Sequence, residues 1–183
     1  MSQSLKKRAI HLLAAAILTT SAVSGASLIA APTVSAAKVS TSQIKLDEKA
    51  AVKKFNNKYA DAKVDEIQLE TKGNKYVYEI SGFDNDKEYS ANVNAKTGKV
   101  TKAHSEKLEQ NDDKTALDLD KAISRKEANR LAEKAAKKGH GQSWTLETDN
   151  GTTIWEVEVV DGHKSTDVKI NAHDKKVIST EAD

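Results

Sequence analysis

The chain contains one pattern written twice, 77 residues apart. Residues 94–100 read NAKTGKV and residues 171–177 read NAHDKKV, and a shift of 77 aligns residues 46–104 with 123–181 without a gap. Twelve of these 59 aligned pairs are identical, and the hydrophobic pattern is shared throughout. A repeat of this length restricts the chain to two similar units, each large enough for one small supersecondary structure.

Each copy begins with a helical pattern. In the second copy Ser124 precedes the helical run and Glu127 follows three residues later, which is the spacing of a capping box. In the first copy Asp47 takes the capping position, and in the second we expect the helix to end at Gly139. The residues expected to face the sheet are Ala51, Val52, Phe55 and Tyr59 in the first helix, and Ile123, Ala128, Leu131, Ala132 and Ala135 in the second.

After each helix the hydrophobic period changes from about 3.6 to 2, the period of a β-strand. The strand patterns YVYEIS and IWEVEV lie between turn sequences rich in Gly, Asn and Asp. We therefore predict an α+β fold of two tandem units, each one helix packed on an antiparallel four-stranded sheet. The strand residues expected in the core are Ile67, Leu69, Tyr76, Tyr78, Ile80, Ala91, Val93, Val100, Trp144, Leu146, Trp155, Val157, Val168, Ile170 and Val177.

Turn lengths predict how the strands pair. A four-residue loop from Ala95 to Gly98 places Val93 opposite Val100. A two-residue turn at Asp161-Gly162 places Trp155 opposite Val168. Both pairings put apolar residues on one face of the sheet, as half-buried antiparallel strands require.

This pattern resembles the PepSY family over about residues 46–104 and 123–181. The resemblance rests on the capped helix, the YVYEIS and IWEVEV strands, and the endings EYSANVNAKTGKV and STDVKINAHDKKV. The second ending has Lys175 where the first has Gly98, so its turn is less typical. PepSY modules resemble parts of the propeptides of secreted thermolysin-like peptidases, and the resemblance implies a protein that binds or restrains a peptidase outside the cell. It transfers no catalytic residue.

The N-terminus has the pattern of a secretory signal peptide. Lys6, Lys7 and Arg8 precede an uncharged stretch from Ala9 to Ala31, and small residues around Ala36 suit signal peptidase. An uncleaved membrane anchor is the alternative, because 23 uncharged residues are long enough to span a bilayer. Ser, Thr and Gly interrupt the stretch, which favours cleavage near Ala36 and a secreted protein, with retention in the cell wall left open.

The expected organisation follows from the signal and the repeat. It comprises a signal peptide (1–36), a mature N-terminal segment (37–45), the first repeat (46–104), a polar linker (105–122) and the second repeat (123–183).

The charge of the exported part argues against nucleic acid as a partner. Removing the three basic residues of the signal from the 29 leaves 26 against 27 acidic residues, a net charge of −1. An evenly mixed surface of this kind lacks the basic footprint of a nucleic-acid-binding protein. The chain has no cysteine, which excludes disulfides, thiol chemistry and a lipidated cysteine.

No motif in the chain points to catalysis, a cofactor or a metal. His104, His140, His163 and His173 show no zinc-site spacing, and we expect them in surface loops. The segment from Asp84 to Glu88 resembles the start of a calcium loop, but Tyr89 and Ala95 stand where an EF-hand needs Gly and Glu. GxSxG and SxxK motifs and phosphate-binding glycine loops are also missing from the sequence. We therefore expect no enzyme activity, no cofactor and no metal site.

Carboxylates on the strands supply the candidate binding residues. They alternate with the core residues and should face away from the helices, where a sheet covered on one side keeps polar residues. They are an ordinary solvated surface or a protein-contact face formed by Glu70, Glu79, Glu147, Glu156, Glu158 and Asp167.

The sequence favours a secreted, non-enzymatic module that binds or restrains an extracellular peptidase or envelope protein in trans. The alternative is a structural envelope protein that binds wall polymer or assembles with itself. No membrane contact is expected after signal cleavage. Identity of the partner and oligomeric state stay open.

Overall fold

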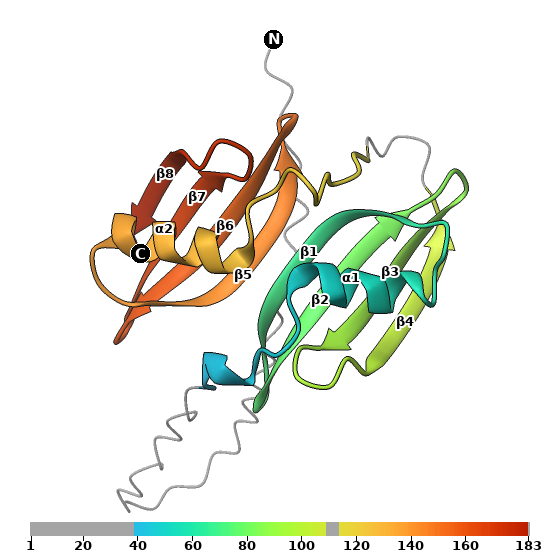
Figure 1. Ribbon diagram of the computed structural model, residues 1–183, viewed down its shortest axis with the longest axis horizontal. Coiled ribbons are helices and arrows are strands. Elements are labelled where there is room, and N and C mark those ends of the chain that lie inside the picture. Colours follow the sequence, from blue (N-terminus) through green and yellow to red (C-terminus); the bar gives the residue numbers. More distant parts are fainter. Residues whose placement is uncertain (1–38, 109–113, 183) are drawn as a thin grey trace, which may run out of the picture. The chain divides into compact units, whose positions relative to one another are not determined.

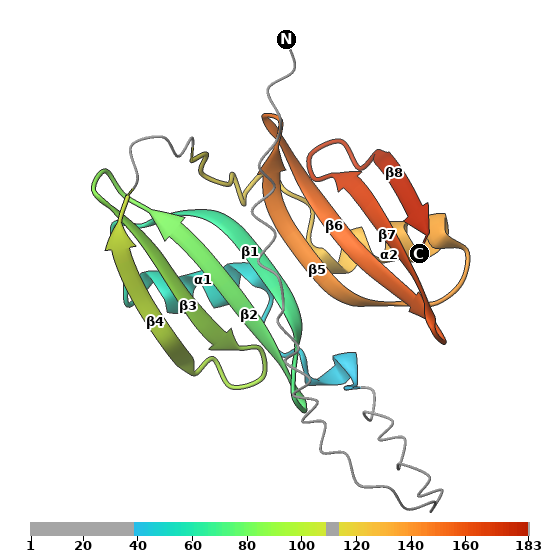
Figure 2. The ribbon, with the colours of Figure 1, turned by 180° about the vertical axis from the view of Figure 1, so that it is seen from behind.

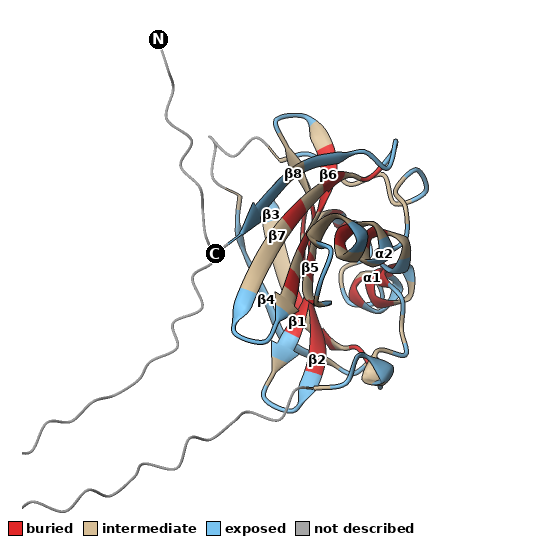
Figure 3. Ribbon diagram, turned by 90° about the vertical axis from the view of Figure 1, so that its left-hand side faces the viewer, coloured by how far each residue is buried: buried red, intermediate tan, exposed pale blue. Residues whose placement is uncertain are grey.

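One antiparallel sheet of eight strands carries two helices on the same face (Figures 1 and 3). The computed structural model describes residues 39–108 and 114–182, which lie within one compact unit. The expected signal peptide lies outside these residues. The elements are η1 (Thr41–Gln43), α1 (Glu48–Asn56), β1 (Lys63–Lys72), β2 (Lys75–Phe83), β3 (Lys87–Asn94), β4 (Val100–Lys107), α2 (Arg125–Ala136), β5 (His140–Asp149), β6 (Thr152–Asp161), β7 (Lys164–Asn171) and β8 (Val177–Ala182). The fold is α+β, as the sequence predicts.

The expected division into two four-stranded units is not confirmed, because the strands form one sheet in the order β4-β3-β2-β1-β5-β6-β7-β8. β1 and β5 join the two copies through three residue pairs, from Ile67 opposite Leu146 to Leu69 opposite Trp144. Ile67 and Trp144 are repeat equivalents, and so are Leu69 and Leu146. The joint is therefore reciprocal, like the interface of a two-fold symmetric dimer.

Both helices begin where the sequence predicts. Asp47 Oδ1 accepts a hydrogen bond from the N–H of Ala50 at 2.8 Å, and Ser124 Oγ accepts one from Glu127 at 3.3 Å. Each cap satisfies one of the backbone donors that the first turn of a helix leaves without a partner.

The expected end of the second helix is wrong by three residues. α2 ends at Ala136, because Lys137 adopts a left-handed conformation with φ of 69° and stops the helix there. Gly139 has φ of 92° and lies against β6, where an added Cβ would stand 2.7 Å from the carbonyl oxygen of Val160. This glycine serves the approach to the sheet rather than the helix end.

The β6–β7 hairpin differs from its expected register by two residues. Trp155 lies opposite Ile170 instead of Val168, because the turn residues are Gly162 and His163. Gly162 supplies a positive φ of 65°, which glycine adopts without strain. A shift of two residues leaves every side chain on its expected face, so the core is unchanged.

The core lies between the helices and the sheet. The expected pairing of Val93 with Val100 is confirmed. Full burial of one large apolar side chain contributes about 1.5–3 kcal/mol before entropy is subtracted. The largest buried side chains on this face are Phe55, Ile67, Leu69, Tyr76, Tyr78, Ile80, Val93, Leu146, Trp144, Trp155 and Ile170.

One polar anchor is repeated in both copies. Tyr78 Oη donates to the carbonyl of Leu46 at 2.8 Å, and Trp155 Nε1 donates to the carbonyl of Ile123 at 2.9 Å. These residues are repeat equivalents, and the polar end of each buried aromatic finds a partner in the backbone that leads into the helix.

The stretch 105–122, expected to be a solvated linker, is partly held by the sheet. The N–H of Leu117 donates to the carbonyl of Val64 at 2.8 Å. Lys114 Nζ lies 2.9 Å from the carboxylate of Asp65 on β1. These contacts tie Lys114 and Leu117 to the first strand of the first copy, and residues 105–107, expected in the linker, belong to β4.

Candidate functional site

Figure 2 shows the face of the sheet turned away from the helices. The strand register places the carboxylates predicted as a contact surface on this face. Side chains alternate along a strand, so the neighbours of core residues such as Leu69 and Trp155 point to this face. The carboxylates are Glu70, Glu79, Glu147, Glu156, Glu158 and Asp167. We call this surface the open face.

Lysines neutralise part of this face in both copies, and they come from different strands. In the first copy Lys72, at the end of β1, lies 3.0 Å from Glu70 and also pairs with Glu79. In the second copy Lys169, on β7, lies 3.5 Å from Glu156. The open face is therefore a surface of mixed charge.

Two further carboxylates lie opposite each other across β6 and β7. The strand register pairs Glu158 with Asp167 directly. Both side chains are partly exposed, which leaves them accessible to a partner. Like charges opposite each other oppose strand pairing.

The joint between the copies has its own acidic pair. Burial, followed by the charges of Glu147 and Asp65, raises the pKa of Glu66 to about 7, although Lys114 acts in the opposite direction. Burial, followed by the charge of Glu156, also raises the pKa of Glu147. Glu66 and Glu147 lie directly beyond the paired residues Ile67 and Leu146 at one end of the β1–β5 ladder, and the charge of Glu147 opposes ionisation of Glu66.

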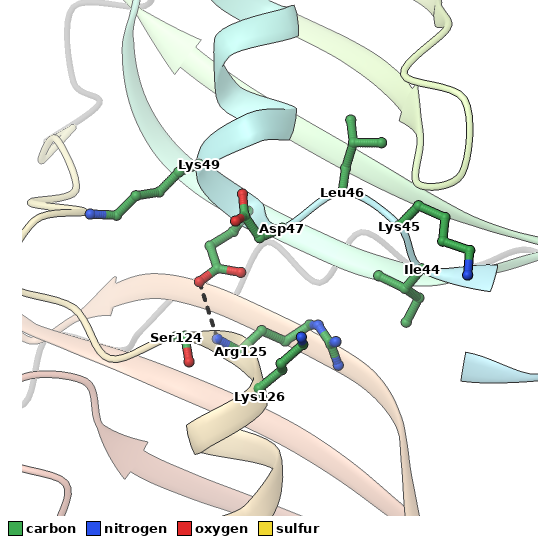
Figure 4. Close-up of a pocket in the computed structure, with 9 residues that line it drawn as sticks. Ile44, Lys45, Leu46, Asp47, Lys49, Ser124, Arg125 and Lys126 are labelled. Atoms are coloured by element: carbon green, nitrogen blue, oxygen red, sulfur yellow. Dashed lines mark hydrogen bonds between the residues drawn. The ribbon is translucent and has the colours of Figure 1, made fainter. Parts of the chain in front are cut away.

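The starts of the two helices enclose a cavity of about 300 Å³ (Figure 4). Glu48 Oε1 accepts a hydrogen bond from the N–H of Arg125 at 3.2 Å, drawn as a dashed line (Figure 4). The Arg125 guanidinium stacks over the Trp144 ring at 4.7 Å. Glu48 and Arg125 are repeat equivalents that meet at the centre of the joint. Glu48 thus caps the helix of the other copy, which gives it a structural role.

The four histidines His104, His140, His163 and His173 do not form a cluster. His163 lies in the β6–β7 turn and His173 after β7, while His104 and His140 lie on β4 and β5. Within residues 39–108 and 114–182 no three His, Asp or Glu side chains are placed to hold a metal ion.

The expected calcium-like segment forms a hydrogen-bonded turn. Asp84 Oδ1 accepts from the N–H groups of Asp86 and Lys87, both at 2.8 Å, and Oδ2 accepts from the hydroxyl of Tyr89 at 2.5 Å. The Tyr89 hydroxyl, followed by the two backbone donors, lowers the pKa of Asp84. Both carboxylate oxygens of Asp84 are thus used by the turn itself.

The two edges of the sheet differ. β8 carries Val177 and Ile178, which are 44% and 55% exposed and are the exposed large apolar residues of the described part of the chain. β4 is interrupted by Lys102, whose φ of 49° lies in the left-handed region, and by a shift in register beside Ser90. β8 also has a shift in register, beside Ile170 of β7, so both edge strands carry an irregularity of the kind that opposes further pairing. The exposed apolar surface of Val177 and Ile178 is what distinguishes β8 from β4.

Sequence reasoning missed a group of lysines on the open face of the first copy. Lys72, Lys75, Lys99 and Lys102 line one depression of about 250 Å³. The signal was available in the repeat alignment, at positions where the copies differ in charge rather than where they agree. In that alignment Lys72, Lys75 and Lys102 correspond to Asp149, Thr152 and Ser179 of the second copy.

Comparisons with known proteins agree with the repeat. The PepSY family, described as "Peptidase propeptide and YPEB domain", matches residues 45–104 and again 122–181. Among solved structures, a putative lipoprotein from Clostridium difficile 630 is similar with a TM-score of 0.69 and 27% identity. The alignment covers 76% of this chain and 95% of that one. No curated protein gives a significant match. None of the helices in the described residues has the length and apolar character needed to cross a membrane.

Proposed function

Because this chain belongs to the PepSY family, we propose that it is a non-enzymatic binding protein that restrains an extracellular peptidase, or another envelope protein, in trans. The match of both copies to a family described by peptidase propeptides carries the proposal. A propeptide acts by binding, so the same module on a separate chain can serve as a binding protein. Secretion by way of the expected signal peptide belongs to this proposal, and the lipoprotein description of the similar structure supports an envelope location.

The apolar edge strand β8 supplies a mechanism for binding. An extended segment of the partner adds to β8 as a further antiparallel strand, and main-chain hydrogen bonds give affinity with little demand on its sequence. Val177 and Ile178 then lose their exposed apolar surface to the partner. The mixed-charge open face beside this edge, including Glu158 and Asp167, contributes contacts that orient the partner.

The test is a titration of thermolysin-like peptidases with the mature chain, following both turnover and complex formation. We expect inhibition or a stable complex at micromolar concentration. Ile178→Lys places a charge on the β8 edge and should weaken the complex at least tenfold. The matched control is Thr101→Lys, which makes the same change at the equivalent position of β4 and should have little effect.

Two results would contradict the proposal. Turnover that stays unchanged at micromolar excess, with no detectable complex, removes the peptidase as partner. Equal losses in Ile178→Lys and Thr101→Lys would remove β8 as the binding edge.

A further inference from the structure

The depression lined by four lysines lies on the open face of the first copy, and its lining contains no carboxylate. Lys72 and Lys75 stand on either side of the β1–β2 turn, and Lys99 and Lys102 come from the β3–β4 connection and from β4. Two asparagines and two threonines complete the polar lining, and Val77 supplies the apolar part. Positive charge and neutral donors are thus collected in a space of about 250 Å³.

The backbone of β4 turns Lys102 toward this depression. Successive residues of a regular strand point to opposite faces, yet Thr101 and Lys102 both line the same space. A bulge explains this, because the register of β4 against β3 shifts between Ser90 and Asn92. Lys102 sits in that bulge with φ of 49°, a strained conformation for a residue with a side chain. The bulge thereby brings a fourth ammonium group to the other three.

Three of the four lysines have no acidic partner within the described residues. Lys75, Lys99 and Lys102 form no ion pair among residues 39–108 and 114–182, and all three are exposed. Lys72 alone pairs with carboxylates, Glu70 and Glu79. The repulsion among these ammonium groups is therefore only partly offset by the protein itself.

The second copy shows that the fold does not need this charge. At the equivalent positions Asp149 replaces Lys72 and Asp174 replaces Thr97, so acidic groups enter the same place. These aspartates are paired, Asp149 with Lys169 at 3.9 Å and Asp174 with Lys176 at 3.0 Å. The same architecture is locally neutral in one copy and strongly basic in the other.

We propose that this depression binds phosphate groups of a polyanion, such as a phosphodiester-linked polymer of the cell envelope. Lysine binds phosphate oxygens as a point charge, and four lysines with no carboxylate in the lining favour a ligand that carries several negative charges. Threonine hydroxyls and asparagine amides supply the additional donors that phosphate oxygens accept. No aromatic side chain lines the space, so bases of a nucleic acid would find no stacking surface. This activity is independent of peptidase binding and would hold the protein near the wall.

The experiment is calorimetric titration of the mature chain with polyphosphate of defined length at several salt concentrations. The affinity should fall steeply with salt, because each bound phosphate releases counterions. The triple variant Lys75→Thr, Lys99→Ser and Lys102→Asn should bind at least tenfold more weakly and lower the salt slope by about 2–3. Inorganic phosphate should bind far more weakly than the polymer, since it offers one group instead of several.

A matched control variant distinguishes binding at this depression from a general effect of positive charge on the protein. The triple variant Lys134→Ser, Lys138→Ser and Lys164→Ser removes the same charge from exposed positions of the second copy and should bind as the unaltered chain does. Peptidase inhibition should be unchanged in both triple variants, which separates the two functions. A circular dichroism spectrum and unfolding curve confirm that each variant is folded.

Several outcomes would overturn the proposal. They are an absence of polyphosphate binding, equal loss of affinity in both triple variants, binding of polyglutamate as tight as that of polyphosphate, and tighter binding of a single-stranded oligonucleotide. Each would show that the lysines do not form a site for a phosphate polymer.

Discussion

At one equivalent cross-strand pair, the two copies place valine and glycine on opposite strands. In the first copy Val64 on β1 lies opposite Gly82 on β2. In the second copy Gly141 on β5 lies opposite Val159 on β6. Each pair holds one valine and one glycine, so its summed side-chain volume is the same although the larger residue has changed strand.

A residue of the helix explains why the glycine lies on β2 in the first copy. Phe55 of α1 is fully buried, and a Cβ on Gly82 would stand 3.2 Å from its ring and 2.8 Å from the carbonyl oxygen of Lys63. In the second copy the small Ala132 replaces Phe55, and Val159 fills space on the strand. A large residue on the helix therefore requires glycine on the strand beneath it.

A tryptophan explains why the glycine lies on β5 in the second copy. Trp144 on β5 replaces Ile67 of the first copy, and its Nε1 donates to Asn129 Oδ1 at 2.9 Å. A Cβ on Gly141 would stand 2.0 Å from that oxygen and 3.0 Å from the Trp144 ring. The aromatic volume has moved from helix to strand, and the glycine has moved with it. What the duplicated fold preserves is total core volume rather than residue identity.

The largest expected effect comes from giving the first copy the helix residue of the second. Phe55→Ala removes a fully buried ring above Gly82, where no valine is present to fill the space, and should cost about 3–5 kcal/mol of unfolding free energy. Urea unfolding measures this loss. Val52→Ala, at the rim of the same helix, serves as the control and should cost clearly less. A loss for Phe55→Ala no larger than that of the control would break the volume comparison.

A smaller effect of opposite sign is expected at the last hairpin of each copy. Gly98 and its equivalent Lys175 both have left-handed backbones, with φ of 72° and 69°. Lys175→Gly relieves strain and should stabilise the chain by about 0.5–1 kcal/mol, after allowance for the greater entropy of glycine in the unfolded state. Gly98→Ala should destabilise by a similar amount. Thermal unfolding of both variants measures the difference, and a change of the same sign in both would contradict the strain argument.

A further expected effect concerns pH, and it tests the joint between the copies. The pKa of Glu66 is raised to about 7 from an ordinary value of 4.5, so the folded chain holds a proton that the unfolded chain releases. Stability should therefore fall as pH rises from about 4.5 and should be lowest above about 7. The groups around it are Glu147, Asp65, Glu79 and Lys114.

Glu66→Gln removes this titration and should stabilise the chain at pH 8 relative to the unaltered protein, with little difference at pH 4.5. Unfolding curves at both values measure the change. The equivalent residue in the second copy is the neutral Ser143, so Ser143→Ala should give no pH-dependent difference. A Glu66→Gln effect that is the same at both pH values would show that burial of the charge is not its cause.

Much of the fold could be predicted from the sequence because it rests on local rules. The caps at Asp47 and Ser124 and the core faces of the strands follow from short-range pattern, and the structure has them as expected apart from Val177, which was expected in the core and is 44% exposed on the edge strand β8. The hairpin register after Trp155 was missed because Gly162 fits more than one turn position. The end of α2 was missed because a lysine, not Gly139, takes the left-handed conformation.

The candidate sites, like the fold, could be predicted from the sequence only in part. The carboxylates of the open face could be placed on one side of the sheet from alternation alone. Their lysine partners could not, since Lys72 and Lys169 reach Glu79 and Glu156 from different neighbouring strands. The lysine depression depends on a bulge at Lys102, which breaks the alternation on which the prediction relied.

By itself the sequence determined a duplicated helix-and-strand unit, because hydrophobic period and turn residues act over a few positions and are repeated 77 residues apart. The tertiary structure alone decided that the copies share one sheet, since the pairing of β1 with β5 depends on edges that are distant in sequence. It also decided which charges meet across strands and which are left without partners. Such contacts depend on distances of a few ångströms between side chains, and no local pattern records them.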